Sequence, residues 1–231
     1  MEKKVVDVSI KRPRGFVKSK TYKQLGILVL DGSGSMEEEC LGNGVIRLTK
    51  GEAVSIATCE FFERIADSTE KKNFCFSVVY YDTDSKLRMD ITDAEKLKTR
   101  DSYNPVEGMG GGTYISEGLK KAHEVANRFL TSKEDSQLSK SVIIIVMSDG
   151  VDMRKEETRR VAEDLKKNEN IQLATCFFET LGADEDAMRE CQEYMKALAS
   201  KPNLYKPAAN AEDLRAFFMD SMAVASPAKI I

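Results

Sequence analysis

Apolar runs and amphipathic helical patterns alternate from one end of this chain to the other, and this alternation restricts the fold more than any other feature. The most apolar run, Val142-Ile143-Ile144-Ile145-Val146, is unbroken, which is typical of a central parallel strand covered on both faces. Strands that alternate with helices favour an open sheet with helices on both faces. The sequence therefore predicts an α/β fold, doubly wound, around a mainly parallel six-stranded sheet.

Strand and helix patterns can be located along the chain by their periodicity. The predicted strands are residues 25–30, 74–81, 86–91, 141–147, 171–178 and 204–205. The predicted helices are residues 51–66, 92–100, 115–129, 155–167, 186–200 and 213–222. The first helix is preceded by Thr49-x-x-Glu52, which has the pattern of a capping box. The run 86–91 follows its neighbour across a short polar stretch, so we expect a hairpin and one antiparallel edge strand.

The chain of 231 residues fits one large domain, and no break in composition suggests a second one. We expect the domain at residues 23–222, with an N-terminal basic arm at 1–22 and a C-terminal tail at 223–231. A solvated arm is a simpler interpretation of the early basic residues than a binding patch. The net charge of −3 gives no general attraction to nucleic acid or to anionic membranes.

The cysteines and the apolar stretches of the sequence indicate in which cellular compartment the protein functions. The five cysteines are odd in number and contain no Cys-x-x-Cys pair, which favours reduced thiols. No apolar stretch resembles a secretory signal, and none approaches the ~20 residues that span a bilayer. We therefore expect a cytoplasmic protein without a membrane partner.

Three unusual loops are predicted at the carboxyl ends of strands, which is where ligands bind in open α/β sheets. The first loop is Asp31-Gly32-Ser33-Gly34-Ser35, which supplies a carboxylate and two hydroxyls on alternate residues. The second is Gly110-Gly111-Gly112-Thr113, which supplies one hydroxyl directly before a helix. The third is Ser148-Asp149-Gly150, at the end of the most apolar strand. We expect these groups to converge on one site.

The donor atoms of this predicted site are all oxygens, without cysteine or histidine. Hard ligands of this kind suit Mg²⁺, Mn²⁺ or Ca²⁺ and disfavour zinc or copper. Three hydroxyls and two carboxylates are few for Ca²⁺, but they suit a small octahedral ion that keeps some of its waters. Mg²⁺ is therefore the first candidate, Mn²⁺ the second, and Ca²⁺ a third.

Together, Asp31-Gly32-Ser33-Gly34-Ser35, Thr113 and Asp149 resemble the metal-ion-dependent adhesion site of the von Willebrand factor A domain family, in order and in loop placement. The resemblance covers nearly the whole predicted domain and implies its Rossmann-like fold. It implies that Ser33, Ser35 and Thr113 touch the ion directly or through water. Asp31 and Asp149 would bind through waters or orient the serines.

In family members, the open coordination position of the ion takes an Asp or Glu side chain of a partner. The resemblance therefore implies a non-enzymatic protein-binding module. Intracellular prokaryotic members are the most similar, including tellurite-resistance-type proteins, which suggests a stress or signalling complex. The sequence identifies neither the partner nor the oligomeric state.

Two other interpretations stay open. Asp82-x-Asp84 after a strand, with Asp149-x-x-Asp152, resembles the loops of Mg²⁺-dependent haloacid-dehalogenase-like phosphohydrolases, with Asp82 as nucleophile; a hairpin turn explains the first pair more simply. A family member with an empty site and a partner bound elsewhere is the third hypothesis. Glu37-Glu38-Glu39 is either a solvated acidic stretch or a group that tunes the neighbouring site.

Overall fold

The computed structural model describes residues 22–40, 48–179 and 184–225. The strands are β1 (Tyr22–Asp31), β2 (Glu39–Cys40), β3 (Leu48–Thr49), β4 (Phe74–Tyr81), β5 (Ser85–Asp93), β6 (Ser139–Ser148), β7 (Ile171–Phe178) and β8 (Tyr205–Ala208). The α-helices are α1 (Lys50–Asp67), α2 (Ile115–Thr131), α3 (Lys155–Lys166), α4 (Glu185–Leu198) and α5 (Ala211–Ala225). The 3₁₀ helices are η1 (Gly34–Glu37), η2 (Lys71–Asn73), η3 (Ala94–Lys96) and η4 (Pro202–Leu204).

Six strands form one sheet in the order β5-β4-β1-β6-β7-β8. All neighbours are parallel except β4 and β5, which pair antiparallel across a tight hairpin. This confirms the predicted mainly parallel sheet with one antiparallel edge strand. A separate ladder, β2–β3, pairs Glu39 with Thr49 next to the start of α1, and the sequence did not predict it.

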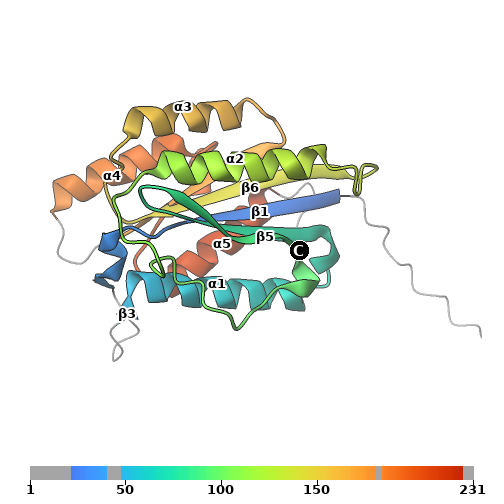
Figure 1. Ribbon diagram of the computed structural model, residues 1–231, viewed down its shortest axis with the longest axis horizontal. Helices are drawn as coiled ribbons and strands as arrows, with labels where there is room; N and C mark the ends of the chain where they lie inside the picture. Colours follow the sequence, from blue (N-terminus) through green and yellow to red (C-terminus); the bar gives the residue numbers. More distant parts are fainter. Residues whose placement is uncertain (1–21, 41–47, 180–183, 226–231) are drawn as a thin grey trace, which may run out of the picture.

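Helices cover both faces of the sheet, and each face has its own apolar core. On one face, α1 and α5 pack on side chains such as Leu28 and Leu30 of β1. On the other face, α2, α3 and α4 pack on Ile27 and Val29. Figure 1 shows α2 and α3 on the opposite side of the sheet from α1. Adjacent residues of β1 thus point to opposite cores, as the period of a strand requires.

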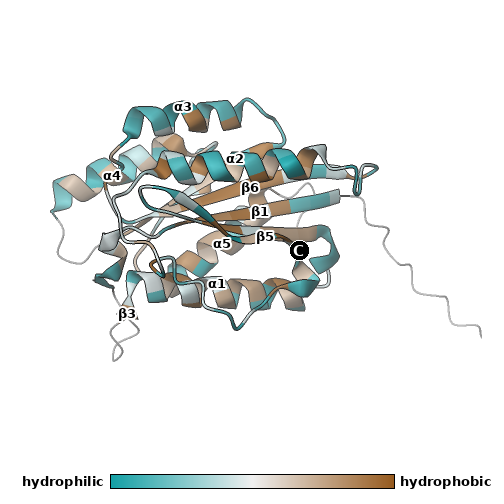
Figure 2. Cartoon of the chain, viewed as in Figure 1, coloured by the Kyte–Doolittle hydropathy of each residue, from teal (hydrophilic) through white to brown (hydrophobic). Residues whose placement is uncertain are grey.

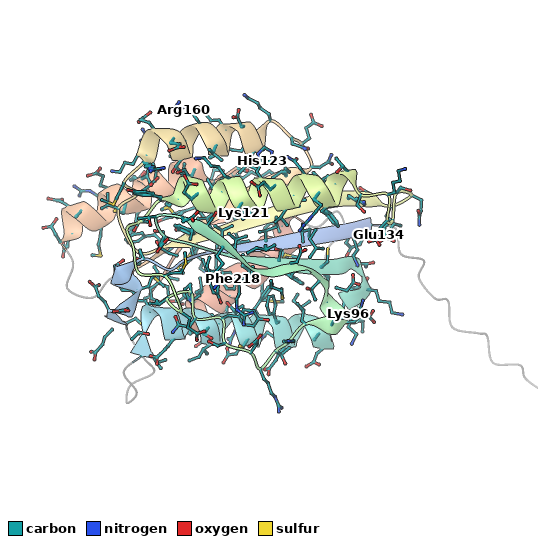
Figure 3. All side chains as sticks on the ribbon, viewed as in Figure 1. Lys96, Lys121, His123, Glu134, Arg160 and Phe218 are labelled. Carbon is teal, nitrogen blue, oxygen red and sulfur yellow. The ribbon has the colours of Figure 1, made fainter. Side chains whose placement is uncertain are left out.

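Hydropathy follows this layered arrangement. Figure 2 shows apolar central strands and helices whose outer surfaces are hydrophilic. Figure 3 labels Phe218, which lies between the sheet and α1; its ring contacts Phe61 edge-on, with 5.6 Å between centroids. Lys121 and His123 belong to α2, in the layer on the other face of the sheet (Figure 3). Among the described helices, none combines the length and the apolar character needed to cross a membrane.

The helix predicted at residues 92–100 is wrong. β5 continues to Asp93, because Thr92 and Asp93 pair with Phe76 and Cys75 of β4. Only Ala94–Lys96 then forms a single 3₁₀ turn, whose first residue has no side-chain cap. Ladder pairing in the sheet outweighs the local helical preference here.

The ends of the predicted domain lie near the ends of the described sheet and helices. β1 begins at Tyr22 and α5 ends at Ala225. Nearly all of the predicted basic arm, residues 1–21, lies outside the described residues, as does residue 226 onward of the tail. All five cysteines are described, and none of them forms a disulfide bond.

Candidate metal site

The candidate site lies where the order of the strands reverses. From β1 the chain moves to β4 and β5 on one side, and it later returns to β6 on the other side. Asp31 is the last residue of β1, and Asp149 directly follows β6, its neighbour in the sheet. The crevice outside the carboxyl ends of two such strands is the usual ligand position in this architecture.

The serine loop turns sharply after β1 and enters η1. The Asp31 carboxylate accepts a hydrogen bond from the Ser33 backbone N–H at 2.8 Å, which folds the loop over the end of the strand. Gly32 allows this close turn, since a Cβ at its position would lie 2.5 Å from the Pro105 carbonyl oxygen. As a result, the Ser33 and Ser35 hydroxyl oxygens lie side by side, 3.2 Å apart.

The two aspartates hold these hydroxyls in place. Asp149 Oδ1 accepts a hydrogen bond from the Ser35 hydroxyl at 2.8 Å. The second oxygen of Asp31 accepts hydrogen bonds from the hydroxyls of Ser148, at 2.7 Å, and Tyr81, at 3.2 Å. Both carboxylates are nearly inaccessible to solvent. Fixed donors around a buried carboxylate leave its position strongly determined.

Thr113 approaches the same place from the glycine-rich loop. A Cβ built on Gly150 would lie 3.4 Å from the Thr113 Oγ1 and 3.7 Å from the Ser35 Oγ, so both hydroxyls border one position. The loop is tied to the serine loop, because the Gly34 N–H donates to the Gly111 carbonyl at 3.1 Å. Gly110 has a φ of +131°, which strongly favours glycine there. The structure thus brings together the five residues predicted from the sequence.

The geometry of these oxygens is compatible with a small octahedral cation. Adjacent ligands of Mg²⁺, each about 2.1 Å from the ion, lie roughly 3 Å apart, close to the observed separation of the Ser33 and Ser35 oxygens. No group of three or more His, Cys, Asp or Glu side chains within the described ranges could hold a metal ion. A cation at this place would therefore depend on hydroxyl oxygens, which are weak ligands for soft metals.

The two buried carboxylates also give the site a negative electrostatic potential, which attracts positive charge. Burial, together with the nearby carboxylate of Asp149, raises the pKa of Asp31 to about 7, against the hydrogen bonds from Ser148 and Ser33. Two carboxylates in a region of low dielectric repel each other. A cation beside them offsets that repulsion.

Lys50 is a residue of this site that the sequence analysis missed. It is the first residue of α1, its side chain is completely buried, and its ammonium lies 2.7 Å from Asp149 Oδ2. The same ammonium lies 2.9 Å from Glu38 Oε2. No sequence motif indicates that Lys50 is part of the site, because a lysine at the start of a helix is usually solvated. One member of the acidic stretch Glu37-Glu38-Glu39 is thus connected to the site through Lys50.

Asp82 and Asp152, the aspartates of the phosphohydrolase alternative, are engaged elsewhere. Asp82 lies in the β4–β5 turn, as the hairpin interpretation predicts, and its two oxygens accept from the backbone N–H groups of Asp84 and Gly111, both at 2.9 Å. Asp152 accepts from the Tyr194 hydroxyl at 2.5 Å and the Arg154 N–H at 3.0 Å. These carboxylates hold loops in place.

Comparison with known proteins gives a family and a fold. The model of the von Willebrand factor type A domain family matches residues 27–221. A search of curated proteins found no match. Among solved structures, the pilus adhesin SpaC from Lactobacillus rhamnosus GG, in its open conformation, superposes with a TM-score of 0.68 at 14% identity, over 90% of this chain and 30% of the adhesin. The chain therefore spans less than a third of that protein.

Two further structures are similar. A von Willebrand factor type A protein from Catenulispora acidiphila has a TM-score of 0.60 and 15% identity, over 87% of this chain and 43% of that one. The proximal thread matrix protein 1 of the mussel byssus, solved with zinc in its metal-ion-dependent adhesion site, has a TM-score of 0.56 and 14% identity, over 89% and 46%. At such identities the likeness shows the fold alone.

Proposed function

This chain belongs to the von Willebrand factor type A domain family, and from that premise we propose that it is a protein-interaction module whose partner binds at a divalent cation. The observation that carries the proposal is the pair of hydroxyls of Ser33 and Ser35, which lie 3.2 Å apart at the switch point of the sheet, with the Ser35 hydroxyl donating to Asp149. Ser33, Ser35 and Thr113 would contact the ion, and Asp31 and Asp149 would bind it through water.

Mg²⁺ is the proposed ion, with Mn²⁺ and Ca²⁺ as alternatives, because all the donors are hard oxygens. The mussel protein carries zinc in its corresponding motif, so zinc belongs in any comparison of affinities. Five protein groups leave an octahedral ion at least one position for another ligand. A carboxylate is the natural ligand there, because the site supplies only two negative groups of its own.

The surface beside the site favours a protein partner. Among the described residues, Val151 and Met153 are the most exposed large apolar side chains, at 53% and 68%, and both lie within four residues of Asp149 in the chain. The Arg154 guanidinium stacks over the Tyr114 ring at 4.0 Å from its centroid, next to them. Exposed apolar and aromatic groups around a polar centre are typical of binding surfaces. We therefore propose a partner that presents an Asp or Glu side chain flanked by apolar residues.

Calorimetry with Mg²⁺, Mn²⁺ and Zn²⁺ tests the site. We expect the native chain to bind Mg²⁺ and Mn²⁺, and the variant Asp31→Ala with Ser33→Ala to bind neither. The matched control is Asp84→Ala with Ser85→Ala, which removes the same side-chain types from the β4–β5 hairpin and should bind like the native chain. Equal binding by all three proteins would contradict the proposal.

A comparison of pull-downs with and without EDTA tests the role of the ion in partner binding. We expect the partner to be lost on chelation. A partner list that chelation leaves unchanged would favour the structural alternative, in which the site plays no part. The proteins recovered would also test the proposed cytoplasmic setting and the likeness to tellurite-resistance-type complexes.

We propose no enzymatic activity, because the two aspartates of the phosphohydrolase alternative already accept hydrogen bonds that fix neighbouring segments. Both oxygens of Asp82 are committed to the loop in this way. A generic phosphatase assay with Mg²⁺ should therefore show no turnover. Activity lost in Asp82→Asn but kept in Ser33→Ala would instead support the phosphohydrolase alternative.

A further inference from the structure

A buried ammonium beside a cation site needs an explanation, because two positive groups compete for the same negative ones. The Lys50 and Asp149 side chains are both fully inaccessible to solvent, so water screens their charges little. The position of Lys50 is fixed by its backbone as well. Its N–H donates to the Glu38 carbonyl at 2.9 Å, and the capping box of Thr49 and Glu52 fixes the first turn of α1.

The two oxygens of Asp149 have separate partners. Oδ1 accepts from the Ser35 hydroxyl, on the side where the serines gather, while Oδ2 lies against the Lys50 ammonium. The lysine therefore neutralises much of the charge that Asp149 would otherwise give to an ion. It also restrains this carboxylate, which limits how far Asp149 can move toward a cation.

The charge of Lys50 affects two affinities of the site: that for a free dication, and that of the bound ion for a carboxylate. A positive charge held close by weakens the binding of a free dication, through simple repulsion. Once the ion is bound, it is less neutralised by the protein and attracts an incoming carboxylate more strongly. Glu38 acts in the opposite direction, because it draws part of the Lys50 charge away from Asp149; its side chain is 56% exposed.

We propose that Lys50 is a positioning residue that tunes this site: it keeps Asp149 from neutralising the cation and so makes the bound ion depend on a carboxylate from the partner. This inference rests on the proposed function, since it assumes that the site binds a cation. It assigns a role to Lys50 and Glu38 that the metal-binding motif itself does not contain.

The test measures two affinities on each purified variant: Mn²⁺ by calorimetry, and acetate, a simple carboxylate, by the change in water-proton relaxation of the Mn²⁺-loaded protein. For Lys50→Gln we expect Mn²⁺ to bind about tenfold more tightly and acetate about tenfold more weakly. The matched control is Lys23→Gln, which alters the lysine of a Lys–Asp pair at the other end of the strands. It should leave both affinities unchanged.

Glu38→Gln tests the same balance in the opposite direction. Its largely exposed side chain can be replaced without loss of the fold, so this variant serves even if Lys50→Gln fails to fold. We expect Mn²⁺ to bind about threefold more weakly and acetate about threefold more tightly, a smaller effect because Glu38 is partly screened.

Opposite changes of the two affinities support the proposal, because a purely structural role would lower both together. A joint loss, or no change in folded variants, would overturn the role of Lys50 while leaving the cation site intact. A native chain that binds no Mn²⁺ would overturn this inference together with the proposed function.

Discussion

Two lysine–aspartate pairs lie at opposite ends of the central strands. Lys50 and Asp149 are 2.7 Å apart at the carboxyl ends, and Lys23 and Asp93 are 2.6 Å apart at the amino ends of β1 and β4. Their surroundings differ: both side chains of the first pair are fully buried, whereas Asp93 is 45% exposed. The first pair adjoins the Ser33 and Ser35 hydroxyls, through the hydrogen bond from Ser35 to Asp149. Two pairs of nearly equal length therefore differ in burial and in neighbours, and the proposed function rests on these differences rather than on distance.

The largest expected difference between the pairs is in stability. In the presence of EDTA, Asp149→Asn should lower the free energy of unfolding by about 3–5 kcal/mol, since it removes the fully buried counter-charge of a buried ammonium. Asp93→Asn should cost about 1 kcal/mol or less, because that carboxylate is 45% exposed and water screens its charge. Urea unfolding measures both values. Equal losses of unfolding free energy in the two variants would show that burial makes no difference between the two pairs.

The second difference is the response to a cation. Mg²⁺ at 100 times its Kd should stabilise the native chain by about 2.7 kcal/mol, and EDTA should reverse this. Thermal unfolding should show the same gain in Asp93→Asn and none in Asp31→Ala. If Mg²⁺ stabilises Asp31→Ala as much as the native chain, the cation acts elsewhere.

A smaller effect is expected from the cap that positions Lys50. Thr49→Ala removes the side chain that accepts from the Glu52 N–H at 3.2 Å, and it should cost about 1 kcal/mol. It should also tighten Mn²⁺ binding slightly, because the Lys50 ammonium is then held less firmly against Asp149. Asp184→Ala removes the corresponding cap of α4, whose side chain accepts from the Ala187 N–H at 2.9 Å. It should cost a similar amount without changing Mn²⁺ affinity. Identical Mn²⁺ affinities in the two variants would show that the Thr49 cap does not affect the metal site.

The smallest effect is that of salt. The coupling energy between Lys23 and Asp93, from a double-mutant cycle, should fall by several tenths of a kcal/mol between low salt and 1 M NaCl. The coupling between Lys50 and Asp149 should change less, because the pair is shielded from solvent. A larger salt effect on the buried pair would mean that water reaches it.

Much of this molecule follows from periodicity and short motifs. β4 and β7 have the predicted bounds, and the Thr49–Glu52 capping box forms as its pattern indicates. The serine loop and Asp149 meet because the carboxyl ends of neighbouring parallel strands lie at one edge. Local patterns are informative here, since they agree with the packing of the sheet.

Other features depend on contacts between distant residues. Thr92 joins a strand because Phe76 offers it a ladder partner, which its local sequence does not reveal. Lys50 is buried because Asp149, 99 positions away, and Glu38 receive its ammonium. A single sequence contains no signal for such a pairing, and a lysine is ordinarily expected at the surface.

A crystal structure of the chain soaked with Mn²⁺ tests the central claim most directly, because the anomalous signal locates the ion. The account predicts a peak about 2.2 Å from the hydroxyl oxygens of Ser33, Ser35 and Thr113, with the Lys50 ammonium still against Asp149. A well-ordered crystal without a peak at this position, or with Mn²⁺ bound to other residues, would contradict it.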